Sequence, residues 1–129
     1  MREKVVSIVC GILVMLACIA AMSACAKKPA VDESQVREYA DPITENILLA
    51  MNEDNYAKYC EHFSETMKNA MPEAVFKETN AIIKDKIGEY QSKEFWKVED
   101  DTFVTVYYKA NFSDEPKDVI VKVVFQEVE

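Results

Sequence analysis

The chain has 129 residues, a length that suits one domain rather than two. Half of the residues are hydrophobic, and 23 acidic side chains against 15 basic ones give a net charge of −8 at pH 7. An acidic protein of this kind is repelled by phosphate backbones, which argues against nucleic acid as a partner.

The first 24 residues have the composition of an export signal. Arg2 and Lys4 precede 22 uncharged residues, Val5 to Ala26. A basic start, an apolar run and small residues before a cysteine are typical of a signal peptide. An uncleaved membrane-spanning helix is the alternative, since 22 residues at about 1.5 Å each reach across a hydrocarbon core about 30 Å thick. Either reading places the rest of the chain outside the cytoplasmic membrane and keeps it attached there.

The residues around Cys25 favour processing. Ser23 and Ala24 are small, as a peptidase that cleaves before Cys25 requires, and with Met22 they resemble the lipobox of bacterial lipoproteins, where leucine is usual at the Met22 position. The resemblance implies that Cys25 becomes the first mature residue and carries a diacylglycerol on its sulfur. Two or three acyl chains hold a protein at a membrane essentially permanently. Residues 25–33 are then a tether, and residues 34–129 a single domain.

The cysteine count agrees with this topology. Cys10 and Cys18 leave with the signal and Cys25 carries lipid, so Cys60 is the one thiol left and no internal disulfide is possible. The remaining chain has 13 basic and 22 acidic side chains, a net charge of −9. We expect such a domain to be repelled by anionic lipid headgroups and to stand off the bilayer.

The first part of the domain has a helical pattern. Apolar residues recur every three or four positions over 36–51, with Asp32 or Ser34 as the cap. Pro42 predicts a kink or a restart of the helix with Asp41 as a new cap. The residues expected on this stripe are Val36, Tyr39, Ala40, Ile43, Ile47, Leu48 and Met51.

Three further helical segments are expected before Gly88. A second short helix carries Tyr56, Tyr59 and Phe63, and Ser64 caps a brief turn that contains Met67. A longer helix opens at Pro72 and stops at Gly88. The residues expected to face inward from this helix are Val75, Phe76, Thr79, Ile82, Ile83 and Ile87.

After Gly88 the pattern changes from helical to alternating. Strands are expected at 94–98, which contains Trp96, at 104–112 and at 119–127. Polar turns at 99–101 and 113–117 separate them, so an antiparallel meander of three or more strands is the simplest arrangement. Its apolar face must be covered by the helices, which predicts a two-layer α+β domain.

Four segments carry a family resemblance: "ADPITENILLAMNEDNYAKYCEHFSETM", "IGEYQSKEF", "VTVYYKANF" and "VIVKVVF". They resemble a family of uncharacterised lipoproteins and secreted proteins from Gram-positive bacteria, a domain of unknown function grouped with the nuclear-transport-factor-like (cystatin-like) folds. The resemblance implies a cone of helices on a curved sheet. Such domains usually continue into a further strand, so the strand from Val119 to Glu127 is expected to be an open edge that accepts a partner's strand, unless the chain is truncated.

No catalytic or metal-binding set is visible in the sequence. Cys60 and His62 are two residues apart, which on a helix points their side chains about 200° apart and prevents a Cys–His nucleophile pair. One histidine and one spare cysteine offer no zinc framework, and the acidic turns lack the glycine-bearing loop of a calcium site. We therefore expect no catalytic residues, no metal and no cofactor.

Two functions from different classes follow. The favoured one is a non-enzymatic binding or interaction module, held by its lipid anchor on the extracytoplasmic face of the cell membrane. Tyr107, Ile120 and Val124 on the outer face of the sheet are its candidate contact patch for an envelope protein, and the sequence identifies no small-molecule ligand. The alternative, implied by the resemblance, is a small isomerase- or dehydratase-like enzyme that uses the conical pocket, with a carboxylate base and tyrosine donors drawn from Tyr90, Tyr107 and Tyr108.

Overall fold

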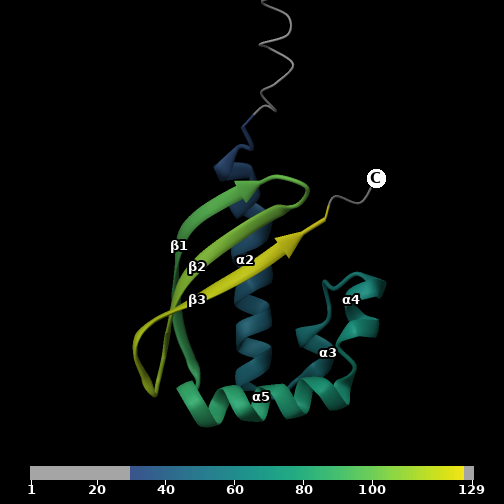
Figure 1. Ribbon diagram of the computed structural model, residues 1–129, viewed down its shortest axis with the longest axis vertical. Helices are drawn as coiled ribbons and strands as arrows, with labels where there is room; N and C mark the ends of the chain where they lie inside the picture. The colour runs from purple at the N-terminus through teal and green to yellow at the C-terminus, as the bar shows by residue number, and fades with distance from the viewer. Residues whose placement is uncertain (1–29, 127–129) are drawn as a thin grey trace, which may run out of the picture. The chain divides into compact units, whose positions relative to one another are not determined.

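A computed structural model describes residues 30–126, and its elements confirm the α+β order of helices followed by strands. The described helices are α2 (Glu33–Asn52), α3 (Tyr56–Tyr59), α4 (Glu65–Ala70) and α5 (Glu73–Ile87), and the strands are β1 (Tyr90–Asp100), β2 (Val104–Phe112) and β3 (Glu115–Phe125) (Figure 1). The three strands form one antiparallel sheet in the order β1-β2-β3, which confirms the meander.

The long helix α2 begins where its cap residue predicts. Asp32 has an extended backbone, and its side chain accepts a hydrogen bond from the Ser34 amide at 3.0 Å. The helix then continues through Pro42, so the alternative of a restart at Asp41 is wrong. The apolar stripe on both sides of Pro42 packs on the same sheet, and this burial outweighs the backbone hydrogen bond that proline cannot make.

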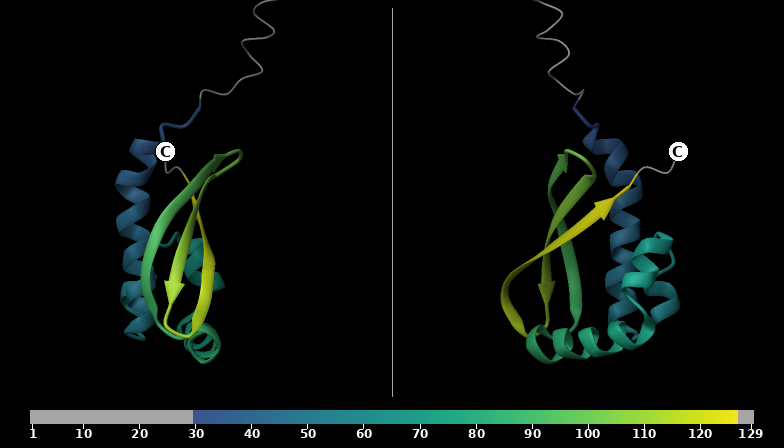
Figure 2. Two further views of the ribbon diagram at one scale, coloured as in Figure 1. Left: turned by 90° about the vertical axis from the view of Figure 1, so that its left-hand side faces the viewer. Right: turned by 45° about the vertical axis from the view of Figure 1, so that its right-hand side comes forward.

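The core lies between α2 and one face of the sheet. Figure 2 shows α2 along this inner face, and no helix of the described part lies along the opposite, outer face. Two clusters of buried side chains fill the space between the layers. One consists of Val36, Ala40, Val104, Val106 and Tyr108, and the other of Leu48, Tyr90, Ala110 and Phe112.

The central strand β2 shows the expected alternation in full. Its five inner residues are buried, whereas Thr105, Tyr107 and Lys109 between them are half-buried on the outer face. On β3 the inner residues Val119, Val121, Val123 and Phe125 are only half-buried. The helices therefore cover the inner face of β2 completely and that of β3 in part.

Strand β1 starts four residues earlier than the pattern indicates and is irregular. Its register with β2 shifts between Tyr90 and Ser92 and again between Phe95 and Lys97. The second shift is a β-bulge that leaves Trp96 as an extra residue on β1. Such a bulge changes the direction of the side chains next to it, which explains why simple alternation failed there.

The helices α3 and α5 depart from the expected apolar pattern. Helix α3 ends at Tyr59, so Phe63 lies outside it. On α5 Phe76 is buried as expected, but Val75 and Ile82 are 39% and 50% exposed, and Asn80 is buried instead. The buried stripe of α5 is narrow because Phe76 and Asn80 are four residues apart and Val75 and Ile82 lie to its sides.

Candidate interaction surface

The predicted lipidation site is outside the part of the chain that the structure describes. Cys25 and the recognition residues Met22, Ser23 and Ala24 precede residue 30, so their processing stays a prediction. Within residues 30–126, none of the helices combines the length and the apolar character needed to cross a bilayer.

The candidate contact residues lie together on the outer face of the sheet. In the register of β2 and β3, Thr105 is opposite Val124, Tyr107 opposite Lys122, and Lys109 opposite Ile120. Directly opposite residues share a face, so Tyr107, Ile120 and Val124 all point outward. Ile120 and Val124 are 48% and 52% exposed.

Trp96 belongs to the same surface, although it was not among the contact residues predicted from the sequence. Its ring meets the Tyr107 ring edge-on, with centroids 6.2 Å apart and an interplanar angle of 78°. Trp96 is 46% exposed, whereas its neighbour Phe95 packs into the core. The adjacent aromatic pair Phe95–Trp96 in the sequence indicates that one ring faces outward. Neighbouring residues of a strand face opposite sides, so both rings cannot be buried in one core.

Lysines surround the two aromatic rings. The Lys97 ammonium lies 5.1 Å from the centroid of Trp96 and 4.6 Å from that of Tyr107. Lys109 lies 5.3 Å from Trp96, and Lys122 lies 5.9 Å from Tyr107. These distances are those of cation–π contacts, which hold the rings in place on the sheet. We call the surface formed by Trp96, Lys97, Tyr107, Lys109, Ile120, Lys122 and Val124 the outer-face patch.

One carboxylate fixes the centre of the outer-face patch. The Tyr107 hydroxyl donates a hydrogen bond to Glu99 Oε2 at 2.9 Å, and Lys97 bonds the other carboxylate oxygen. These hydrogen bonds from Lys97 and Tyr107 lower the pKa of Glu99, and the bond to Glu99 raises the pKa of Tyr107. Tyr107 is therefore a neutral donor with a fixed orientation at neutral pH.

The other two tyrosines of the enzyme hypothesis bond to carboxylates of α2 instead of facing a pocket. The Tyr108 hydroxyl donates to Asp41 Oδ1 at 2.7 Å, and the Tyr90 hydroxyl donates to Glu45 Oε2 at 2.6 Å. Burial and these hydrogen bonds raise the pKa of both tyrosines. Tyr108 is only 1% exposed, so its hydroxyl links α2 to the sheet from inside the core.

A small depression lies between the end of α2, α3 and α5. It has a volume of about 20 Å³, enough for one water molecule or methyl group. Its lining residues include one amide, that of Asn80, and two hydroxyl-bearing residues, Tyr59 and Thr79, but no carboxylate. The lining residues are Met51, Tyr59, Met71, Phe76, Thr79, Asn80 and Ile83.

Cys60 and His62 do not sit on a helix as expected, because α3 ends at Tyr59 and both lie in a turn. The Cys60 sulfur is 3.8 Å from the carbonyl of Ala57, and His62 Nε2 is 4.0 Å from Glu61. Cys60 is half-buried and His62 exposed. In the described ranges, no three His, Cys, Asp or Glu side chains are grouped so as to hold a metal ion.

Comparison with known proteins gives one match. The model of a family described as a protein of unknown function, DUF3887, matches residues 44–129. No curated protein and no solved structure matches the chain. The nuclear-transport-factor-like arrangement and the lipoprotein assignment therefore stay predictions.

Proposed function

This chain belongs to the DUF3887 family of proteins of unknown function, and we propose that it is a lipid-anchored lipoprotein whose folded domain is a non-enzymatic binding module. It acts on the extracytoplasmic face of the cell membrane, held there by acyl chains on Cys25. The run Met22-Ser23-Ala24-Cys25 after 17 uncharged residues, from Val5 to Ala21, supports the anchor.

The outer-face patch supports a binding role for the domain. Trp96, Ile120 and Val124 are each about half exposed, at 46%, 48% and 52%, and they lie on one face of a three-stranded sheet. Tryptophan and tyrosine are the residues that contribute most often to binding hot spots, and a regular sheet presents them in a fixed arrangement. A grouped aromatic and aliphatic surface of this kind marks a contact site more often than single exposed residues do.

The anchor is tested by replacing Cys25 with serine in the full chain. A serine hydroxyl cannot form the thioether, so the variant should lose both the diacylglycerol and the cleavage before residue 25. Mass spectrometry of the membrane-extracted protein measures both. Cys60→Ser is the matched control, since that thiol lies in the folded domain, and it should be processed as usual. Normal trimming and membrane retention of the Cys25 variant would overturn the proposal.

The contact surface is tested separately by site-specific photo-crosslinking in intact cells. A photoreactive residue at position 96 or 120 should give crosslinks to the same envelope component. The same residue at Leu49, which is 36% exposed on α2, is the control for general surface exposure. If position 49 crosslinks as well as positions 96 and 120, or if neither outer-face position crosslinks, the outer-face patch is not the contact surface.

A further inference from the structure

We propose that the exposed face of α5 in one copy of the chain docks on the outer-face patch of a second copy, so that the partner of the patch is the protein itself. The inference rests on the proposed function, because it names the partner of the contact surface proposed there. Two surfaces carry it, one acidic and one basic, and each combines charge with exposed apolar side chains.

The acidic surface is a single stripe along α5. Four exposed residues of this helix are three, four and three positions apart, which places them on one side of it. They are Val75, Glu78, Ile82 and Asp85. The buried residues Phe76 and Asn80 belong to the opposite side, so this acidic stripe faces away from the core. Its charge is negative even when Lys86, at the end of the helix, is counted with it.

The carboxylates of the acidic stripe are available for a contact with another molecule. Among the ion pairs of residues 30–126, none includes Glu78 or Asp85, whereas Glu73 on the same helix is paired with Lys77 at 2.9 Å. Two opposite charges on a partner could therefore pair with the stripe without breaking an existing ion pair.

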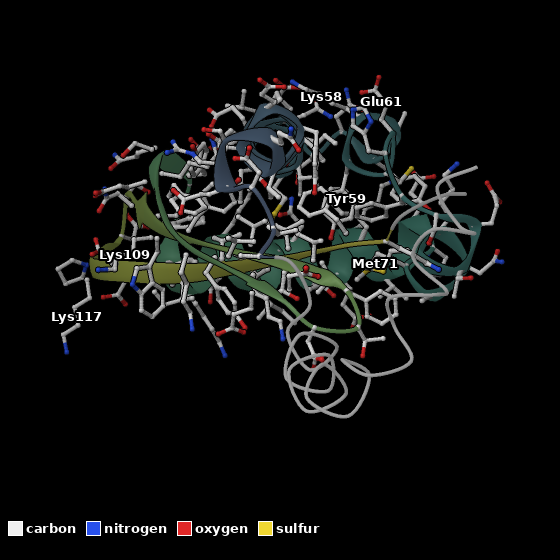
Figure 3. The ribbon with its side chains drawn as sticks, turned by 90° about the horizontal axis from the view of Figure 1, so that it is seen from above. Lys58, Tyr59, Glu61, Met71, Lys109 and Lys117 are labelled. Atoms are coloured by element: carbon white, nitrogen blue, oxygen red, sulfur yellow. The ribbon has the colours of Figure 1, made fainter. Side chains whose placement is uncertain are left out.

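The basic surface is the outer-face patch. Lys97 is already paired with Glu99, but no ion pair of the described residues includes Lys109 or Lys122. Figure 3 shows Lys109 on the far side of the molecule from Glu61, so the acidic groups around α3 do not neutralise it. The charges that an occupant of the patch would meet unpaired are therefore positive, and they select an acidic occupant.

The spacing of the two lysines agrees with that of the two carboxylates. Ile120 is directly opposite Lys109, and Lys122 is two residues further along β3, so the lysines are diagonal neighbours about 7–8 Å apart. Glu78 and Asp85 are seven positions apart, which is about 10 Å along a helix. The flexible four-carbon stems of lysine can make up this difference.

The apolar side chains of the two surfaces would cover each other. Val75 and Ile82 on α5, and Trp96 and Ile120 on the sheet, are each between 39% and 50% exposed. A helix is the layer that the outer face lacks, because none of the described helices lies along it (Figure 2). Trp96 and Tyr107 are on β1 and the central strand β2, so this surface does not depend on what lies beside the edge of β3.

The contact joins two different surfaces, and both are exposed in the single chain, so they do not cover each other within one copy. Figure 1 shows α5 across one end of the domain rather than along the sheet. Such a heterologous contact links copies into rows or rings. One helix face is a small interface, and anchoring in a common membrane would raise the effective concentration of the copies. The net charge of −8 opposes association at long range, so opposite charges must lie directly against each other.

The contact is tested by photo-crosslinking the full chain in intact cells from the α5 side. A photoreactive residue at position 82 should give a product with the mass of two chains. Mass spectrometry of the crosslinked peptides should place the second attachment on the outer face of β1, β2 or β3. The same residue at Leu49, which is 36% exposed on α2, should give much less of this product.

Charge variants with the photoreactive residue at position 82 then test the pairing. Glu78→Lys should lower the yield of the two-chain product at least about tenfold, because it places like charges together. Glu38→Lys is the matched control, since Glu38 is also exposed and is in no ion pair of the described part.

Reversing both surfaces should restore the product. This variant combines Glu78→Lys and Asp85→Lys with Lys109→Glu and Lys122→Glu, so the signs are exchanged and the attraction is kept.

Crosslinks from position 82 to a different protein, absence of the two-chain product, equal loss in the two single lysine variants, or no recovery on reversal would each overturn the self-association. In any of these cases, crosslinks from positions 96 and 120 to another envelope component would still support the proposed contact surface. The processing of Cys25 is independent of all of them, so failure here is distinguishable from failure of the proposed function.

Discussion

Gly88 connects the helical half of the domain to the sheet, and its backbone decides how the two meet. Its φ is +79°, a value that glycine adopts far more easily than other residues. A β-carbon at this position would collide with Ser113 Oγ and lie 2.8 and 2.9 Å from Asp114 Cγ and N. The chain passes close to the β2–β3 turn here, where the Asp114 amide bonds the carbonyl of Ile87 at 3.0 Å.

The substitution Gly88→Ala should therefore destabilise the domain by about 2 kcal/mol or more, from backbone strain and overlap with the turn. Urea denaturation measures the change. In the double variant Gly88→Ala, Ser113→Ala the loss should be smaller than the sum of the two single losses, because Ser113 Oγ is the atom nearest to the new methyl group. Strict additivity would show that the steric account is wrong.

Two neighbouring tyrosines on β2 allow a comparison of how much a buried and an outer-face hydroxyl contribute to the free energy of unfolding. Tyr108 is 1% exposed and donates to Asp41, whereas Tyr107 donates to Glu99 on the outer face. Removing the buried Tyr108 hydroxyl takes the hydrogen bond away from Asp41 Oδ1, while Arg37 still bonds Asp41 Oδ2 at 3.1 Å.

Tyr108→Phe should cost about 2 kcal/mol of unfolding free energy, and Tyr107→Phe should change stability little. Thermal and urea denaturation of the two variants under the same buffer conditions checks this ordering. A larger loss for Tyr107→Phe would mean that the outer-face patch, rather than the α2–sheet contact, stabilises the strand.

At the level of elements, polar contacts hold the second half of α2 to the start of β1. Glu45 accepts hydrogen bonds from the Tyr90 hydroxyl and from Lys93 at 2.6 and 2.9 Å. Near the end of α2, the Asn52 side chain bonds both the N–H and the C=O of Tyr90, at 2.9 and 2.8 Å. The amide of Asn52 thus acts as a strand partner for the first residue of β1.

The hydrogen bonds of Glu45 predict that the free energy of unfolding depends on pH. Burial raises the pKa of Glu45, but hydrogen bonds from Tyr90 and Lys93 together with the Lys93 charge outweigh it and leave the pKa below its ordinary value of 4.5. A folded-state pKa below the unfolded one stabilises the protein above pH 4.5, and the contribution is lost as the pH falls through the lower folded value.

The stability difference between the native chain and Glu45→Gln should accordingly be largest near pH 7 and shrink below about pH 4. Urea denaturation over this pH range measures it. The native chain carries other carboxylates that also titrate, so the difference between the two proteins is the relevant quantity. A difference that is constant with pH would rule out an ionised Glu45 as the stabilising group.

At the level of the whole molecule, the excess of carboxylates opposes compactness. The chain has 23 acidic and 15 basic side chains, so repulsion between carboxylates exceeds attraction between opposite charges. Salt reduces this net repulsion over a screening length of about 8 Å at physiological ionic strength. Many lysines are already in ion pairs, such as Lys84 with Asp54 at 2.7 Å and Lys77 with Glu73 at 2.9 Å. The unpaired carboxylates account for the remaining repulsion.

Sodium chloride should therefore raise the thermal midpoint of the full chain by a few degrees between about 0.05 and 0.5 M. A variant with Glu38 and Glu78 changed to glutamine should show a smaller rise, because no ion pair is formed by these two exposed residues in the described part. Differential scanning calorimetry gives both values. A midpoint that falls with salt would mean that the ion pairs contribute more than the net repulsion costs.

The features that could be predicted from the sequence are local ones. Ser64 and Gly88 end helices where the pattern placed them, and of the two caps expected for α2, Asp32 or Ser34, the structure has Asp32. The alternation over 104–112 identified β2 and its inner face, because a strand covered on one side must bury every second residue. The meander followed from short turns between such strands.

Contacts between residues far apart in the chain could not be predicted, because they depend on how the elements pack. Tyr108 finds its acceptor on Asp41, 67 positions earlier, and the bulge after Phe95, which places Lys97 opposite Tyr107, depends on the pairing of β1 with β2. Val75 and Ile82 have the right spacing for burial on α5 but find no layer above them. The spacing of apolar residues indicates which face of a single helix or strand is apolar. Contacts, bulges and exposed edges depend instead on how the other elements pack against it.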